Sequence, residues 1–86
     1  MAYYIALIHK EPDSGYGMSF PDVPGVTAVA DTLDEAMREA SAALGFAFED
    51  WTGDRPTSRT LDALRRDPEF LDHSADAVVA AVTPAS

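Results

Sequence analysis

The chain has 86 residues, no cysteine, six Lys and Arg against 15 Asp and Glu, and a formal net charge of −9 at pH 7. This length fits one small domain, the charge argues against unaided binding to a phosphate backbone, and the lack of cysteine excludes a disulfide framework and a Cys-type zinc site. No apolar run approaches the ~20 residues of a membrane helix and nothing resembles a signal peptide, so we expect a soluble, cytoplasmic protein.

The first predicted element is a strand over residues 2–9, because Ala2 to Ile8 are apolar without interruption. A strand that is apolar on both sides fits the middle of a sheet with both faces covered. The cluster Glu-Pro-Asp-Ser-Gly at residues 11–15 interrupts regular structure and predicts a loop.

A β-hairpin is predicted next, with strands over 16–20 and 26–31. Large and small residues alternate in the first of these strands, which is typical of a half-buried strand. Pro24 presets φ for the first central position of a turn, and Gly25 adopts the positive φ that a type II turn requires at the second. The three strands up to this point form an antiparallel meander.

The main helix is predicted over residues 33–51. Thr32 and Glu35 have the spacing of a capping box, in which the threonine oxygen accepts the N–H three residues on. Gly45 costs about 1 kcal/mol relative to alanine in a helix interior and weakens the pattern slightly. One apolar stripe follows the helical period, formed by Leu33, Ala36, Met37, Ala40, Leu44, Ala47, Phe48 and Trp51.

Beyond the helix, Thr60 is positioned to cap a short helix that ends before Pro68, and residues 68–71 predict one further turn. Residues 77–82 are apolar and valine-containing and predict a fourth strand, parallel to the first by a right-handed crossover. Residues 83–86 are expected to be a frayed end. The predicted fold class is α+β, in the order β-β-β-α-β, with a four-stranded mixed sheet and one main helix packed on one face.

Two features bear on partners. Phe46 lies opposite the apolar stripe, among Glu35, Arg38, Glu39 and Glu49, and is either covered by the segment that follows the helix or exposed for a partner. One helix covers one face of the sheet, so the other face requires residues 54–75 or a second copy. Since that segment is short and polar, a homodimer or homotetramer is the preferred expectation.

Catalytic groups are not predicted. His9 and His73 stand alone in different segments, whereas a metal site needs more ligands at defined spacing. The predicted central strand carries no carboxylate, although a two-metal nuclease site needs several that converge. The chain is therefore expected to be no enzyme and to use no cofactor.

Several stretches, in this order and spacing, resemble the HicB-like antitoxin domain. They are Tyr3–Ile8, the run Tyr-Gly-Met-Ser-Phe-Pro-Asp-Val-Pro-Gly at 16–25, the helix start at 30–36, Asp67–Phe70 and the strand at 77–82. The resemblance implies a partial ribonuclease H-like topology with strand order 3-2-1-4, without nuclease activity. It also implies a partner, a small basic mRNA interferase of the HicA type, which family members neutralise by covering its active site.

Many members of that family carry a C-terminal DNA-binding module, whereas this sequence ends at Ser86 just after the last predicted strand. We therefore expect residues 1–86 to form a single HicB-like domain without such a module. The toxin is expected to bind Phe46, Glu35, Glu39 and Glu49, with Asp22 as a weaker candidate because its carboxylate suits a bond within its own turn. The alternative is a stand-alone oligomeric regulatory or ligand-sensing domain without a toxin.

Overall fold

A computed structural model describes residues 3–12 and 15–85. The predicted strand, loop and chain end extend to Ala2, Asp13, Ser14 and Ser86, and at these residues they lie outside the described part. The elements, in chain order, are β1 (Tyr4–Lys10), β2 (Tyr16–Ser19), β3 (Thr27–Ala30), α1 (Leu33–Glu49), α2 (Leu61–Leu64), α3 (Pro68–Ser74) and β4 (Val78–Val82).

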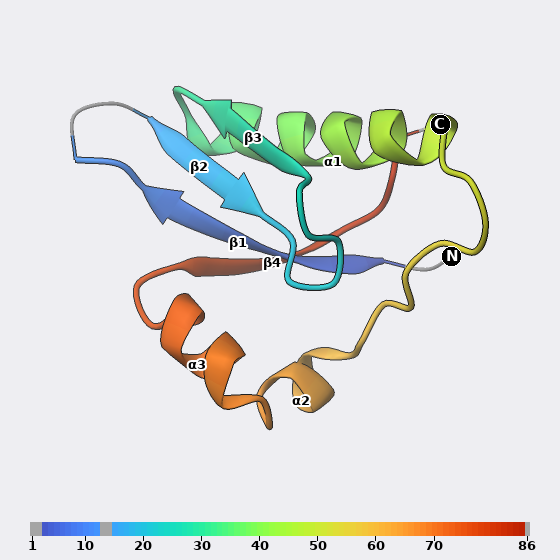
Figure 1. Cartoon of the computed structure of the whole chain (residues 1–86). Helices are drawn as coiled ribbons and strands as arrows, with labels where there is room; N and C mark the ends of the chain where they lie inside the picture. The colour runs from blue at the N-terminus through green and yellow to red at the C-terminus, as the bar shows by residue number, and fades with distance from the viewer. Residues whose placement is uncertain (1–2, 13–14, 86) are drawn as a thin grey trace.

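The four strands form one sheet in the order β3-β2-β1-β4, with α1 on one face and α2 and α3 on the other (Figure 1). The strand order is the expected one. The prediction of a mixed sheet is wrong, because β4 pairs antiparallel with β1. The pairs β1–β2 and β2–β3 are antiparallel as well. The partial ribonuclease H-like topology stays a prediction.

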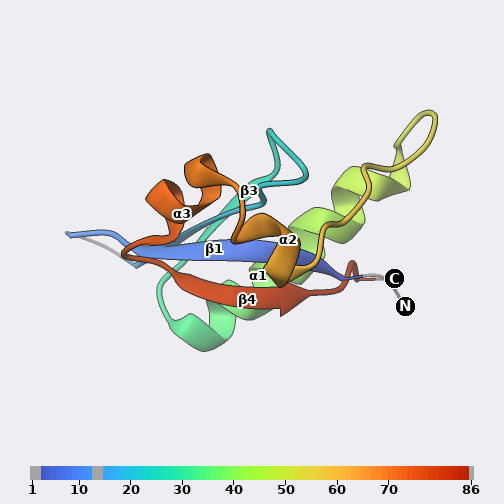
Figure 2. The ribbon, with the colours of Figure 1, turned by 90° about the horizontal axis from the view of Figure 1, so that it is seen from below.

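The direction of β4 follows from the path of residues 50–77. Beside the start of β1, the Tyr4 hydroxyl donates to the Pro56 carbonyl over 2.7 Å. Near the end of β1, His9 Nε2 lies 2.9 Å from the carbonyl oxygen of His73. The segment therefore travels the length of the sheet after α1 has already done so, and β4 begins beside the end of β1 (Figure 2). A direct helix-to-strand crossover would have made β4 parallel.

The larger core lies between α1 and the sheet. Alternate residues of a strand point to opposite faces, so Tyr4, Ala6 and Ile8 of β1 face α1. They pack in one buried cluster with Met18, Phe20, Val23, Ala36, Ala40, Leu44, Phe48 and Val82. Four of the eight residues in the predicted helical stripe are thus fully buried, whereas Leu33 and Trp51 at its two ends are exposed.

A second, smaller core covers the other face. Ile5 and Leu7 of β1 are buried there against Leu64 of α2 and Phe70 of α3. Residues 54–75, although short and largely polar, therefore cover this side of β1 through α2 and α3. Of the two expected covers for this face, residues 54–75 supply it. The preference for a homodimer or homotetramer therefore loses this basis, and self-association stays a prediction.

The predicted turn and helix-capping residues make the contacts that the sequence indicates. Gly25 has φ of 93°, and the Val26 N–H donates to the Val23 carbonyl over 3.3 Å, as in a type II turn. The Thr32 side chain accepts from the Glu35 N–H at the start of α1. Capping by Thr60 at α2 is likewise observed, because its side chain accepts from the backbone N–H of Ala63.

The segment after β4 is held against α1. The Ser41 hydroxyl donates to the Thr83 carbonyl over 2.6 Å, and the Ala85 N–H donates to the Ser41 carbonyl over 3.0 Å. A side chain at Gly45 would overlap the carbonyl oxygen of Ala85. The described residues 83–85 are thus bonded to the helix, contrary to the expected frayed end, and Gly45 allows their close approach.

Candidate protein-binding surface

Phe46 is exposed on the outer face of α1. Its exposed fraction is 74 %, which excludes the alternative in which the following segment folds back over it. A phenylalanine that leaves most of its ring in water gains little from burial within its own chain. Phe46 is therefore available to a partner.

Glu35, Glu39 and Glu49 are exposed on the same helix. At 100° per residue, all three lie within about 60° of Phe46 around the helix axis. No hydrogen bond or ion pair within the described part of the chain engages their carboxylates. The structure thus places four of the five predicted site residues on one face of α1, with Phe46 between Glu39 and Glu49 along the helix.

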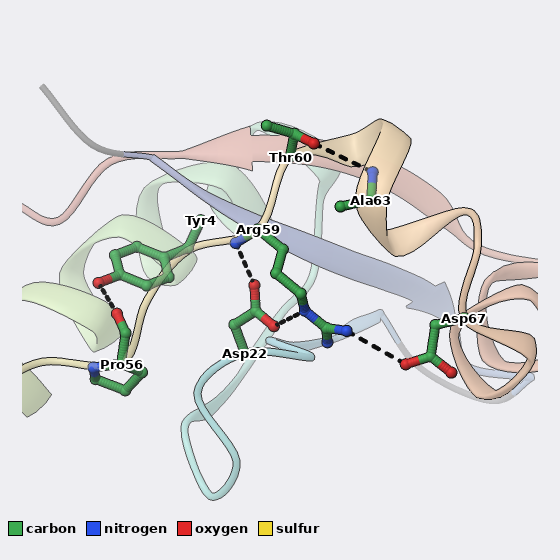
Figure 3. Close-up of polar contacts among 7 residues, drawn as sticks. All are labelled: Tyr4, Asp22, Pro56, Arg59, Thr60, Ala63 and Asp67. Carbon is green, nitrogen blue, oxygen red and sulfur yellow. Dashed lines mark hydrogen bonds and ion pairs between the residues drawn. The ribbon is translucent and has the colours of Figure 1, made fainter.

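Asp22, the fifth predicted residue, lies elsewhere and is occupied. Its carboxylate accepts from the Arg59 backbone N–H and from Arg59 Nε, each over 2.7 Å (Figure 3). Its side chain is only 7 % exposed. The bond within its own turn that the sequence suggested is replaced by a bond to a distant segment. Asp22 holds the hairpin turn to the chain that follows α1 and is a poor candidate for toxin contact.

Arg59 extends this contact to the start of α3. Its Nη1 lies 3.3 Å from Asp67 Oδ2, while Asp67 Oδ1 accepts from the Glu69 N–H over 3.0 Å. The Glu69 N–H and then the Arg59 guanidinium hold the pKa of Asp67 below its ordinary value. The hydrogen bond to Asp22, followed by that to Asp67, raises the pKa of Arg59 despite some opposing desolvation. The three side chains form a structural link between the hairpin turn and α3.

An open hollow of about 230 Å³ lies between the end of β2 and α3. Arg59 and Asp67 line it together with Glu69, Phe70 and His73 of α3 and residues 19–21. The guanidinium of Arg59 is already bonded to two carboxylates, so it is not a free cation for an anionic ligand in the hollow. Within the described residues, no group of His, Asp and Glu is arranged to hold a metal ion.

Arg59 is the structural contact that the sequence did not predict. It stands in a polar loop with no periodic pattern around it, so nothing local points to a partner 37 residues away. The sequence did predict that the Asp22 carboxylate accepts a backbone hydrogen bond. The donor is the Arg59 N–H, however, and not an N–H of its own turn.

No helix in the described part of the chain is long and apolar enough to cross a membrane. A scan against protein-family models matches residues 4–85 to the HicB-like antitoxin of bacterial toxin–antitoxin systems. A curated protein of Haemophilus phage HP1, described as an uncharacterized 14.9 kDa protein, is 36 % identical over 75 residues. That match covers 84 % of this chain and 55 % of the phage protein.

Three solved structures are similar to this chain over almost its full length. The Burkholderia pseudomallei antitoxin HicB is similar with a TM-score of 0.72 and 29 % identity, over 96 % of this chain and 63 % of that one. The N-terminal domain of that antitoxin matches with a TM-score of 0.75 and 28 % identity, over 99 % of this chain and 100 % of the domain. A chain of the HicA3 and HicB3 toxin–antitoxin complex shares the fold, with a TM-score of 0.74 at 17 % identity over 99 % of this chain and 100 % of that one.

Proposed function

Because the chain belongs to the HicB-like antitoxin family of bacterial toxin–antitoxin systems, we propose that it neutralises a small, basic, HicA-like mRNA interferase in the cytoplasm by binding it and covering its active site. Its role is binding rather than catalysis. The solved complex of HicA3 with HicB3, in which a chain of the same fold occurs, supports a partner of this class.

The observation that carries the proposal is the outer face of α1. An exposed aromatic ring suits the centre of an interface, where a few large side chains supply most of the binding energy. Free carboxylates around it attract a basic protein and speed its association. The net charge of −9 acts in the same direction over a longer range.

A ligand-sensing role without a toxin is less well supported. The open hollow beside α3 is the concave feature that such a role would use. Its Arg59 is held by Asp22 and Asp67 at 2.7 and 3.3 Å, and these bonds would have to break before the guanidinium met a ligand. The outer face of α1 needs no such rearrangement.

The test begins with the small basic protein encoded beside this chain's gene, co-expressed and purified with it. Phe46→Ala should weaken binding about thirtyfold or more, the effect of removing a central anchor worth roughly 2 kcal/mol. Val29→Ala is the matched control, because Val29 is 78 % exposed and alternates along β3 with Ala28 and Ala30, which pack on the α1 side, so that it points away from α1. Both variants should unfold at the wild-type urea concentration.

Glu39→Gln separates charge from contact. Removing one rim carboxylate should mainly slow association and flatten its dependence on salt, with little change in the dissociation rate. The proposal fails if no basic neighbour binds, or if the toxin is bound and neutralised equally well by the wild type and by a Phe46→Ala, Glu39→Gln double variant.

A further inference from the structure

β4 is an edge strand whose outer side is open. It pairs with β1 on one side, and within residues 3–12 and 15–85 the sheet order places no strand on the other (Figure 2). All five of its residues are apolar, reading Val-Val-Ala-Ala-Val. Val78 is 49 % exposed and Val79 is 36 % exposed, so valine side chains lie in water beside unpaired backbone groups.

An edge of this kind normally carries a device against pairing with another chain. The usual devices are a lysine or another charge on the strand, a proline, a bulge or a covering segment. β4 has neither charge nor proline, and its pairs with β1 run without interruption from Tyr4–Val82 to Ile8–Val78. The open edge is therefore competent to add a strand.

We infer that this edge pairs with β4 of a second copy, antiparallel about a two-fold axis at Ala80, so that two sheets join into one of eight strands. Such an axis is normal to the sheet, so the face of the sheet that carries α1 lies on the same side in both copies. A residue that points to one face must then lie opposite a residue that points to that same face, and the two residue numbers are both even or both odd. Centring on Ala80 opposes Val78 to Val82 and Val79 to Ala81, and uses the whole five-residue strand. β3, the other edge strand, has four residues. A two-fold axis that follows the same rule must pass through a residue, so it cannot pair all four of them with each other.

Charge favours a second copy over a basic toxin at this edge. Two molecules of net charge −9 repel each other and associate best through an uncharged surface. The nearest acidic residue in sequence, Asp76, would lie opposite residue 84 of the second copy rather than opposite another Asp76. A basic partner gains nothing from an edge without carboxylates and instead fits the outer face of α1. The inference does not depend on the toxin proposal, since it concerns the chain alone.

The first test measures the mass of the purified chain by light scattering and sedimentation at concentrations up to about 100 µM. We expect twice the 9.2 kDa mass of the monomer. Val79→Lys should raise the dimer dissociation constant roughly tenfold or more, because it places a charge in the new pairing. Val29→Lys makes the same change at an exposed valine of the other edge strand and should leave the dimer intact.

The second test locates the axis. Ala80 is the residue that would oppose itself, and opposed Cβ atoms lie about 4.5–5.5 Å apart, close to the spacing of a disulfide. The chain has no cysteine, so Ala80→Cys provides a single thiol that should give a covalent dimer on mild oxidation. Ala28→Cys, at a half-buried alanine of β3, is the matched control and should stay largely uncrosslinked.

Each outcome decides the matter. A dimer that Val79→Lys disrupts and Ala80→Cys traps supports the inference. A wild-type chain that is monomeric throughout overturns it, as does a dimer that Val79→Lys leaves intact or that Val29→Lys disrupts instead. Circular dichroism should show the same fold for all four variants, and the Ala80→Cys result remains decisive if Val79→Lys fails to fold.

Discussion

Arg59 donates to the carboxylate of Asp22 from its backbone N–H and from its side-chain Nε, each over 2.7 Å, although 37 residues separate the two. The contact fixes the hairpin turn, whose Val23 is fully buried, to the segment that leaves α1 and crosses under the sheet. One residue thus secures the path on which the position of α2 and α3 depends.

Replacing Asp22 should cost more stability than replacing Arg59. Asp22→Ala leaves two donors of Arg59 without their acceptor and should lower the free energy of unfolding by about 1–3 kcal/mol. Arg59→Ala removes its partly exposed guanidinium but keeps the backbone bond to Asp22, and should cost less. Urea unfolding followed by far-UV circular dichroism gives both values. Equal costs would show that the backbone bond contributes nothing.

Acid should weaken the fold through Asp67. The pKa of this carboxyl lies below its ordinary value of 3.8 in the folded chain, because the Glu69 N–H and Arg59 stabilise its charged form. Its stabilisation is therefore present above that ordinary value and is lost as the pH falls through the lower, folded pKa. Between about pH 5 and pH 2.5, the urea midpoint should fall less steeply for Asp67→Asn than for the wild type. Parallel curves would contradict this role.

The second core should prove essential to stability. Leu64 is fully buried against the face of β1 opposite α1, so Leu64→Ala should cost about 2–5 kcal/mol. Leu71→Ala removes the same atoms from a residue that is 50 % exposed and should change stability by less than about 0.5 kcal/mol. Thermal and urea unfolding compare the pair. Similar small effects in both would mean that α2 and α3 do not contribute to the cooperative unit.

Gly45→Ala should not stabilise α1, although alanine is favoured by about 1 kcal/mol at an ordinary helix position. The added methyl group would overlap the Ala85 carbonyl and push residues 83–85 away from the helix. The expected result is a lower unfolding free energy, with faster hydrogen exchange at the Ala85 amide, which is bonded to Ser41 in the wild type. A gain in stability would show that the segment moves aside freely.

Local features of the fold were predictable because each depends on a few neighbouring residues. Pro24 and Gly25 specify their turn, and Thr32 and Thr60 specify where α1 and α2 begin, by chemistry that acts over three or four residues. The direction of β4 was not predictable in this way. The apolar run at residues 77–82 indicates burial, whereas direction depends on the route of the 28 residues between α1 and β4.

The residues of the candidate surface were likewise predictable where they depend on local geometry and not where they depend on a distant segment. Helical periodicity placed Phe46, Glu35, Glu39 and Glu49 on one face, because residues of one helix share a fixed geometry. Asp22 was misassigned because its partner, Arg59, comes from a distant segment without regular structure. Long-range polar pairs leave no periodic trace in a sequence, and the hold of Ser41 on residues 83–85 escaped prediction for the same reason.

Pairing of β1 with β4 also sets an order of events during synthesis. Of the four described strands, β1 leaves the ribosome first and β4 last, so one side of the central strand stays open until residue 82 has emerged. Contacts so far apart in sequence make closure of a sheet slow, and exposed strand edges favour aggregation meanwhile. A nascent chain stalled before residue 78 should therefore be digested by protease, whereas one released after residue 85 should resist it.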